Sequence, residues 1–237
     1  MHRFLAAVCT AAVASLLVAV PAGAATRPSA APPAFCSTLD ALLTRMNGTT
    51  AAVRTPATRR AVVAVMHGAP HAVAKPAGTL GRSLLQLIDH GNKSVKSAEK
   101  KRASKAGVAL LTWGGLHCPE VREKLLTSRV ESALRDGLTN AKGLYTDADS
   151  YAAVTPEALA AAEPALQFTA GPATPGDAHS VSVHVTDATH IVMAASTGRT
   201  CFYIADDATG MGTQFAQVVE PTCDAAAPPP QFTVAWK

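Results

Sequence analysis

The chain has 237 residues, a formal charge of +4 at pH 7 and a hydrophobic content of 48%. Beyond its N-terminal segment it holds no apolar run of the ~20 residues that a membrane-spanning helix needs. Its charge is divided unevenly, because residues 25–118 hold 13 Lys and Arg against 3 Asp and Glu, whereas residues 119–237 hold 7 against 14. This polarity either holds the two halves together or presents a basic face to an acidic partner.

Residues 1–24 are typical of a secretory signal peptide. Arg3 provides a basic start, an apolar run extends from Phe4 to Val20, and small residues form a cleavage site before Ala25. The apolar run is shorter than a membrane span and ends at a proline, not at basic stop residues. We therefore expect a secreted protein, extracellular or associated with the cell wall, with no transmembrane segment in its mature chain.

Four cysteines remain after the predicted signal peptide: Cys36, Cys118, Cys201 and Cys223. In an exported chain an even number favours disulfides over metal ligation or a reactive thiol, and none of the spacings resembles a zinc site. Three pairings are possible, and the sequence alone does not choose between them. We favour Cys36–Cys118 and Cys201–Cys223 because each bond then stays within one half. No metal or cofactor is expected.

The first half of the mature chain predicts helices only. Residues 25–34, rich in Ala and Pro, predict a flexible lead-in. Apolar residues at helical spacing then predict a bundle of about four helices, which forms a domain over residues 35–118. The expected helices run from a capping-box-like start at Ser37 to Gly48, from Thr55-Pro56 to Gly68, from Thr79 to His90, and from Lys93 through Trp113. Pro76, Gly78 and Gly81 oppose the first half of the third helical stretch, so its secure part is placed at Thr79–His90.

The second half, residues 119–237, opens with one long amphipathic helix from Pro119 to Tyr151. Glu120 lies in its first turn, where the helix dipole favours negative charge. The expected buried side consists of Leu126, Val130, Ala133, Leu134, Leu138, Ala141 and Tyr145. Thr155-Pro156 then starts a short helix that ends by Pro164.

After this short helix the hydrophobic period changes to two, which predicts strands. The expected strands are Ser180–Val185, Ile191–Ala195 and Thr200–Ala205, and the tail from Gln231 to Trp236 could supply a last edge strand. Gly210-Met211-Gly212 is expected to be a flexible loop. The predicted fold class is α+β, with a helical bundle followed by a long helix packed on an antiparallel sheet.

The order of several motifs in the second half resembles the globular part of type IV pilins and pseudopilins. These motifs are Leu144-Tyr145-Thr146-Asp147, Ser150-Tyr151, Glu163-Pro164-Ala165-Leu166, Gly198-Arg199-Thr200-Cys201-Phe202-Tyr203 and a second cysteine near the end. The resemblance covers about half of the mature chain. It implies a pilin-like fold whose Cys201–Cys223 loop matches the disulfide-closed C-terminal region, a surface that pilins commonly use for contacts.

The chain departs from pilins at the start of the long helix. Pilins carry a processing site followed at once by a hydrophobic half-helix that builds the fibre core, whereas here a charged first turn follows a separate helical domain. A secreted protein that carries only the globular part therefore fits better than an ordinary pilus subunit. Fold resemblance alone does not establish function.

One run of basic residues is a candidate for binding an anionic surface. It consists of Lys93, Lys96, Lys100, Lys101, Arg102 and Lys105, and only Glu99 offsets it. The functional interpretation is a helix face that binds a wall polymer, a membrane or nucleic acid. The alternative is a solvated face that pairs with the acidic second half. The run contains no aromatic residue for stacking on bases, so we expect no nucleic-acid partner.

Histidines are the candidates for metal binding or catalysis. His184 and His190 lie in or beside neighbouring predicted strands and could be close. His67 and His71 are four residues apart, but a glycine and a proline between them keep them off one regular helix face. Ser196 with His190 and Asp206 would supply the residue types of a catalytic triad, yet no Gly-x-Ser-x-Gly elbow is present.

The leading hypothesis from the sequence is a secreted, non-catalytic binding protein of the cell envelope or extracellular space. Its expected partner is an anionic wall polymer or an envelope protein. One alternative is a minor pilin-like subunit of a pilus or secretion assembly. The other is a metal-binding protein or hydrolase that uses His184 and His190.

Overall fold

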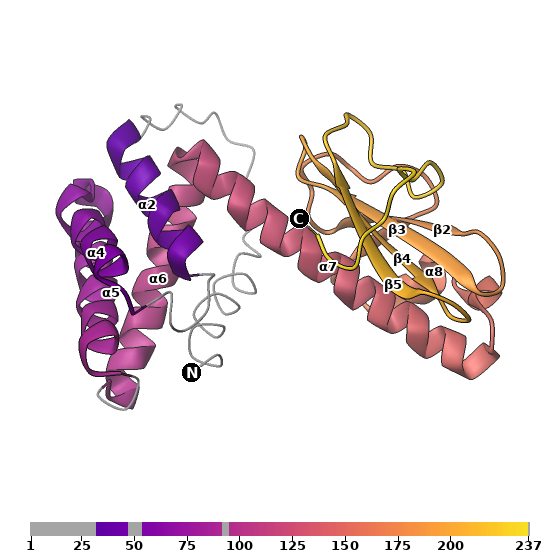
Figure 1. Ribbon diagram of the computed structural model, residues 1–237, viewed down its shortest axis with the longest axis horizontal. Coiled ribbons are helices and arrows are strands. Elements are labelled where there is room, and N and C mark those ends of the chain that lie inside the picture. Colours follow the sequence, from indigo (N-terminus) through magenta and orange to yellow (C-terminus); the bar gives the residue numbers. More distant parts are fainter. Residues whose placement is uncertain (1–31, 47–53, 92–94, 237) are drawn as a thin grey trace. The chain divides into compact units, whose positions relative to one another are not determined.

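The computed structural model describes residues 32–46, 54–91 and 95–236 (Figure 1). The predicted signal peptide and most of the lead-in lie outside these residues. The described part is α+β, with six α-helices and one five-stranded mixed sheet. The chain divides into two compact units, residues 1–125 and 126–237. The sequence places this boundary seven residues earlier, between Cys118 and Pro119.

The first unit is helical. Its helices are α2 (Pro33–Met46), α4 (Pro56–Gly68), α5 (His71–His90), α6 (Ser97–His117) and the start of α7 (Pro119–Ala148). Along the chain, α2 packs on α4, α4 on α5, and α5 on α6. The four helices predicted upstream of Cys118 are therefore present, and Thr55 caps α4 as expected, because its side chain accepts a hydrogen bond from the Thr58 N–H.

Two helices begin earlier than the sequence predicts. Helix α2 starts at Pro33, so Ser37 lies inside it and donates its hydroxyl to the Pro33 carbonyl instead of forming a capping box. Helix α5 starts at His71 and continues through Pro76. Burial of Val73 and Ala77 on these additional residues offsets the loss of the hydrogen bond that Pro76 cannot make.

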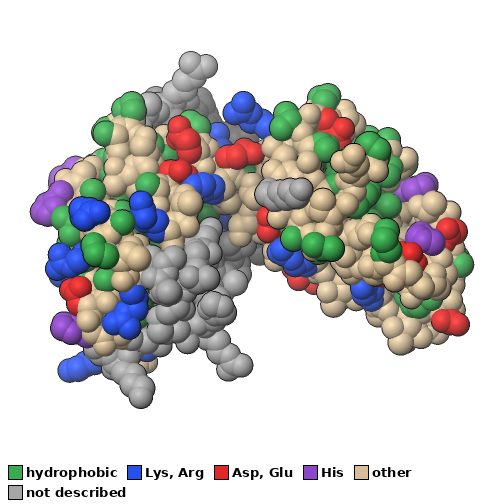
Figure 2. Space-filling view, in the orientation of Figure 1, with side chains coloured by type: hydrophobic (Ala, Val, Ile, Leu, Met, Phe, Trp, Pro, Cys, Tyr) green, Lys and Arg blue, Asp and Glu red, His purple; other side chains and the backbone are tan. Residues whose placement is uncertain are grey.

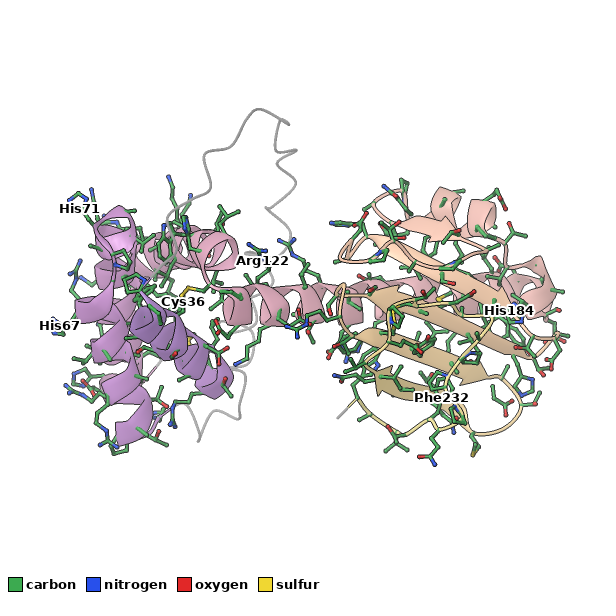
Figure 3. All side chains as sticks on the ribbon, turned by 90° about the horizontal axis from the view of Figure 1, so that it is seen from above. Cys36, His67, His71, Arg122, His184 and Phe232 are labelled. Carbon is green, nitrogen blue, oxygen red and sulfur yellow. A yellow bond between two sulfur atoms is a disulfide. The ribbon has the colours of Figure 1, made fainter. Side chains whose placement is uncertain are left out.

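The core of the first unit includes Phe35, Leu39, Leu42, Val62, Val65, Leu84, Leu110 and Val121. The disulfide Cys36–Cys118 joins α2 to the residue between α6 and α7, which is one of the two pairs that the sequence favours (Figure 3). Trp113 packs edge-on against Phe35 with ring centroids 5.6 Å apart. The first turns of α7 belong to this unit, because Val121 is fully buried in its core.

The second unit contains the rest of α7, the short turn η2 (Tyr151–Ala153), helix α8 (Pro156–Ala162) and the sheet. Its strands are β1 (Gln167–Thr169), β2 (Ser180–Val185), β3 (His190–Ser196), β4 (Cys201–Asp207) and β5 (Gly212–Val218), in that spatial order. Strand β1 pairs in parallel with β2, and the other pairs are antiparallel. The expectation of a purely antiparallel sheet is therefore wrong.

The parallel pairing follows from the connection between β1 and β2. Residues 170–179 carry the chain back to the same end of the sheet, and Ala173 on this connection forms a bridge with Cys223. Strand β5 is also absent from the sequence prediction. Of the expected flexible loop Gly210-Met211-Gly212, the last residue, Gly212, is the first residue of β5.

The sheet is covered on both faces. Its first face packs against α7, with Val130, Leu134 and Leu138 of the helix in one core with strand residues such as Met193 and Ile204 (Figure 1). Its second face, which includes Ala194 and Tyr203, packs with Ala225 of the C-terminal segment and the Cys201–Cys223 disulfide. The edge strand predicted for the tail is reduced to one bridge between Phe215 and Thr233.

Within the described ranges, no helix is both long enough and apolar enough to cross a membrane.

Candidate anion-binding cleft

The predicted basic run divides over different sides of α6. Lys101, Arg102 and Lys105 are exposed, and their spacings of three and four residues place them on one side of the helix. Lys100 is only partly exposed and lies on another side. Lys96 immediately precedes the helix. Lys93 lies outside the described residues.

A cleft of about 330 Å³ lies between α5 and the start of α6. Its lining residues are Thr79, Arg82, Ser83, Lys96, Ala98, Glu99 and Arg102. It brings Lys96 and Arg102 from the predicted run next to Arg82 of α5. Sequence reasoning missed Arg82 because it is an isolated cation, separated along the chain from the basic run. Figure 2 shows Lys and Arg side chains scattered over the visible face of the helical unit, with fewer Asp and Glu side chains among them.

The charges around the cleft are not balanced within the described residues. Glu99 is the one carboxylate in its lining, and no ion pair joins Arg82, Lys96 or Arg102 to any described acidic residue. The Ser83 hydroxyl, whose residue is only 6% exposed, donates to Glu99 Oε1 at 3.3 Å. This hydrogen bond joins the two walls of the cleft. The three cations and the one carboxylate of the lining together give the cleft a net charge of about +2.

The start of α6 carries charges that do not favour the helix. Lys96 is the N-cap residue and makes no side-chain capping bond, and Glu99 is the only acid in the first turn. The partial positive charge of a helix N-terminus disfavours cations there, so Lys96 opposes the dipole. The helix dipole therefore does not account for Lys96. A bound anion would interact favourably with this lysine and with the start of the helix.

The two histidines of the alternative hypothesis lie on neighbouring strands, β2 and β3. His184 on β2 lies opposite Val192 on β3, and Val192 is two residues along β3 from His190. No hydrogen bond joins the two histidines. Ser196 and His190 occupy opposite ends of β3, so the triad residues are apart. His67 and His71 lie on the outside of the helical unit, whereas His184 lies on the sheet unit (Figure 3). No group of three or more possible metal-ligating side chains occurs in the part of the chain that the structure describes.

His190 is instead held between two carboxylates. Its Nδ1 lies 2.8 Å from Asp187 Oδ1 and its Nε2 lies 3.4 Å from Asp207 Oδ2. The backbone N–H of Thr189 and the His190 ring lower the pKa of Asp187 to about 2. The hydrogen bond to Asp187 raises the pKa of His190 above its ordinary value of 6.5. The His190 ring thus links the β2–β3 turn to the end of β4.

Comparison with models of protein families, with curated proteins and with solved structures found no match to this chain. Any functional assignment therefore rests on the chain's own residues.

Proposed function

We propose that this chain is a secreted, non-catalytic binding protein that attaches to anionic polymers of the cell envelope or extracellular space. The observation that supports this proposal is the convergence of Arg82, Lys96 and Arg102 on one cleft without a described acidic partner apart from the lone Glu99. The exposed side chains of Lys101 and Lys105 extend the same charge along α6. Such a surface attracts polyanions in a salt-dependent manner.

The proposed location has two sources of support. Residues 1–24 have the pattern of a secretory signal peptide. In addition, the structure holds two disulfides, Cys36–Cys118 and Cys201–Cys223, and such bonds persist mainly in oxidising compartments outside the cytosol.

Retention of the mature chain on immobilised polyglutamate and polyphosphate tests this function. We expect retention at low salt and elution as the salt concentration rises, because salt screens exposed charges. The triple variant Lys101→Gln, Arg102→Gln, Lys105→Gln should elute at clearly lower salt than the parent chain.

A matched triple variant, Arg45→Gln, Arg60→Gln, Lys75→Gln, removes three other exposed cations of the same unit and the same total charge. It should elute close to the parent. Equal losses from both triple variants would mean that total charge alone causes retention, and the assignment to α6 would then be wrong. A parent chain that passes through both resins at low salt would overturn the proposed function.

The same variants address the alternative that the basic side of α6 pairs with the acidic second unit. In that case the α6 triple variant would lower the thermal stability of the chain while the matched variant would not. On the proposed function both variants keep the parent's stability, because the changed side chains are exposed and have no described acidic partner.

A second candidate function is a minor subunit of a pilus-like or secretion assembly. Two features favour it: α7 packs along one face of the sheet, and a C-terminal disulfide closes the segment that contains β5. The sequence resemblance to the globular part of pilins is the reason for considering this kind of assembly. Cross-linking of the chain to other assembly subunits in cells would support this candidate, whereas a uniformly monomeric secreted form would count against it.

A further inference from the structure

We propose that the cleft between α5 and α6 is a specific site for a phosphate group. This inference rests on the proposed function, because it names the anionic group that the basic surface recognises. The cleft has a volume of about 330 Å³ and takes side chains from both helices, so it differs from a flat charged face.

The charge of the cleft suits a dianion better than a single carboxylate. Arg82, Lys96 and Arg102 contribute three positive charges, and Glu99 contributes one negative charge. A phosphate monoester carries roughly −1.5 to −2 at pH 7 and offers three strong acceptor oxygens. It therefore matches the remaining +2, whereas one carboxylate leaves about half of that charge without a partner.

The donor groups also suit phosphate. The guanidinium groups of Arg82 and Arg102 come from different helices, and each presents a planar pair of N–H donors of the kind that binds phosphate oxygens in a bidentate manner. Lys96 adds a third cation at the end of α6, where the backbone N–H groups of the first turn have no intrahelical acceptor.

The two walls of the cleft are joined before a ligand arrives. The hydrogen bond from Ser83 to Glu99 joins α5 to α6 at the cleft, and the two helices pack against each other along their length. Arg82 and Ser83 are neighbours on one wall, and Glu99 and Arg102 lie one turn apart on the other. A site of this kind loses less conformational entropy on binding than one assembled by the ligand.

The position of Lys96 allows a role in binding to be distinguished from a role in stabilising the fold. Lys96 opposes the dipole of α6, so Lys96→Gln should raise the melting temperature of the helical unit slightly while it weakens phosphate binding. A lysine that stabilises the fold would show a decrease in both measurements.

Titration of the full mature chain with inorganic phosphate, followed by calorimetry and by backbone NMR shifts, tests the proposal. We expect saturable binding with shifts centred on the residues that line the cleft, and binding weaker by about 10- to 100-fold in Arg82→Gln and in Arg102→Gln. The control Arg60→Gln, an exposed cation on α4, should bind phosphate as the parent does. Acetate should bind much more weakly than phosphate.

Dimethyl phosphate, which carries a single charge, distinguishes the source of the phosphate group. Tighter binding of inorganic phosphate assigns the cleft to free phosphate or phosphomonoesters, and equal binding of the two assigns it to the diester backbone of a polymer. The inference is overturned if phosphate binds no more tightly than acetate or if Arg60→Gln weakens binding as much as Arg82→Gln. Polymer retention that persists in that case leaves the proposed function intact, whereas loss of both removes both.

Discussion

Asp206 is the most deeply buried charge among the described residues, with only 4% of its surface exposed. It accepts hydrogen bonds from Tyr151 Oη at 2.6 Å and Thr213 Oγ1 at 2.7 Å, and its ion pair with Lys142 Nζ measures 2.7 Å. Burial raises the pKa of Asp206, but the bonds from Lys142, Tyr151 and Thr213 outweigh it and hold the pKa below its usual value. This network fastens the end of α7 to the sheet.

Tyr151→Phe tests the strength of this network. The variant removes one hydrogen bond to a buried carboxylate, and we expect the free energy of unfolding of the second unit to fall by about 1–3 kcal/mol. Tyr145→Phe is the matched control, since its ring lies 4.6 Å from the Tyr151 ring but makes no hydrogen bond to Asp206. Urea denaturation measures both. An equal loss in Tyr145→Phe would assign the effect to ring packing and not to the hydrogen bond.

The cluster around His190 predicts a pH dependence. The pKa of His190 is raised in the folded chain, so the stabilisation from its charged form is complete below pH 6.5, the ordinary value, and is lost as the pH rises through the raised value. The second unit should therefore melt at a lower temperature at pH 8 than at pH 6. The pKa of Asp187 is lowered to about 2, so its own contribution is constant over this interval.

His190→Gln should flatten this pH dependence, and thermal melts between pH 6 and pH 8 measure it. His184→Gln is the control, because it removes a neighbouring histidine without touching Asp187 or Asp207. If the melting temperature still depended on pH in His190→Gln but no longer did so in His184→Gln, the pH dependence would belong to His184 and the assignment to His190 would be wrong.

The sequence indicates the roles of some single residues, such as the cysteines, but not those of others, such as Arg82. The sequence allows three cysteine pairings and favours the one that keeps each bond within one half, and the structure has both of those bonds. Arg82 was not identified, because nothing along the chain shows that α5 places it beside Lys96 and Arg102. Likewise the Asp187–His190–Asp207 cluster depends on the register between β3 and β4, which pairs His190 with Asp207.

At the scale of elements, helix α5 packs closely against α4 at Gly81. A Cβ atom at this position would lie 2.2 Å from Met66 Cγ, so Met66 would have to move. We expect Gly81→Ala to destabilise the first unit by about 1–3 kcal/mol, the usual cost of overpacking. Thermal or urea unfolding measures the change.

Gly78→Ala is the control for this prediction, because it changes the same helix at a position where the nearest atom, on Arg82, lies 3.5 Å away at an ordinary contact distance. There alanine should stabilise the helix by roughly 0.5–1 kcal/mol through its higher helix propensity. Stabilisation by both substitutions would contradict the close packing of α5 on α4.

Elements with strong local signals are predicted well, and those that depend on distant partners are not. Thr55 and Thr155 cap α4 and α8 as their sequences indicate. The middle of the predicted buried side of α7 is confirmed, because Val130, Leu134 and Leu138 have exposures of at most 4%, whereas Leu126 and Tyr145 at its two ends are only partly buried. Strand β1 has only three residues and forms because it pairs in parallel with β2. No local sequence pattern indicates such a pairing.

At the scale of the whole molecule, each compact unit has its own disulfide. Removal of the Cys36–Cys118 bond by serine substitution opens a loop of 82 residues and should cost the first unit about 4–5 kcal/mol in the chain-entropy model. Removal of the Cys201–Cys223 bond, with a separation of 22 residues, should cost the second unit about 3 kcal/mol.

Calorimetry of the two disulfide variants should show two transitions, of which each variant shifts mainly one. This expectation follows from the separate hydrophobic cores of the two units. A single transition that moves as a whole in both variants would show that the units unfold together. The parent chain under oxidising conditions provides the reference.

The division of the chain inside α7 limits how the two parts can be produced separately. A fragment that stops at Cys118 lacks Val121, which is completely buried in the first core, and Lys124, which forms an ion pair with Asp40. A fragment that extends through Leu125 keeps both contacts. Limited proteolysis that targets exposed loops would leave the two cores joined, because the peptide bonds between them are part of a continuous helix.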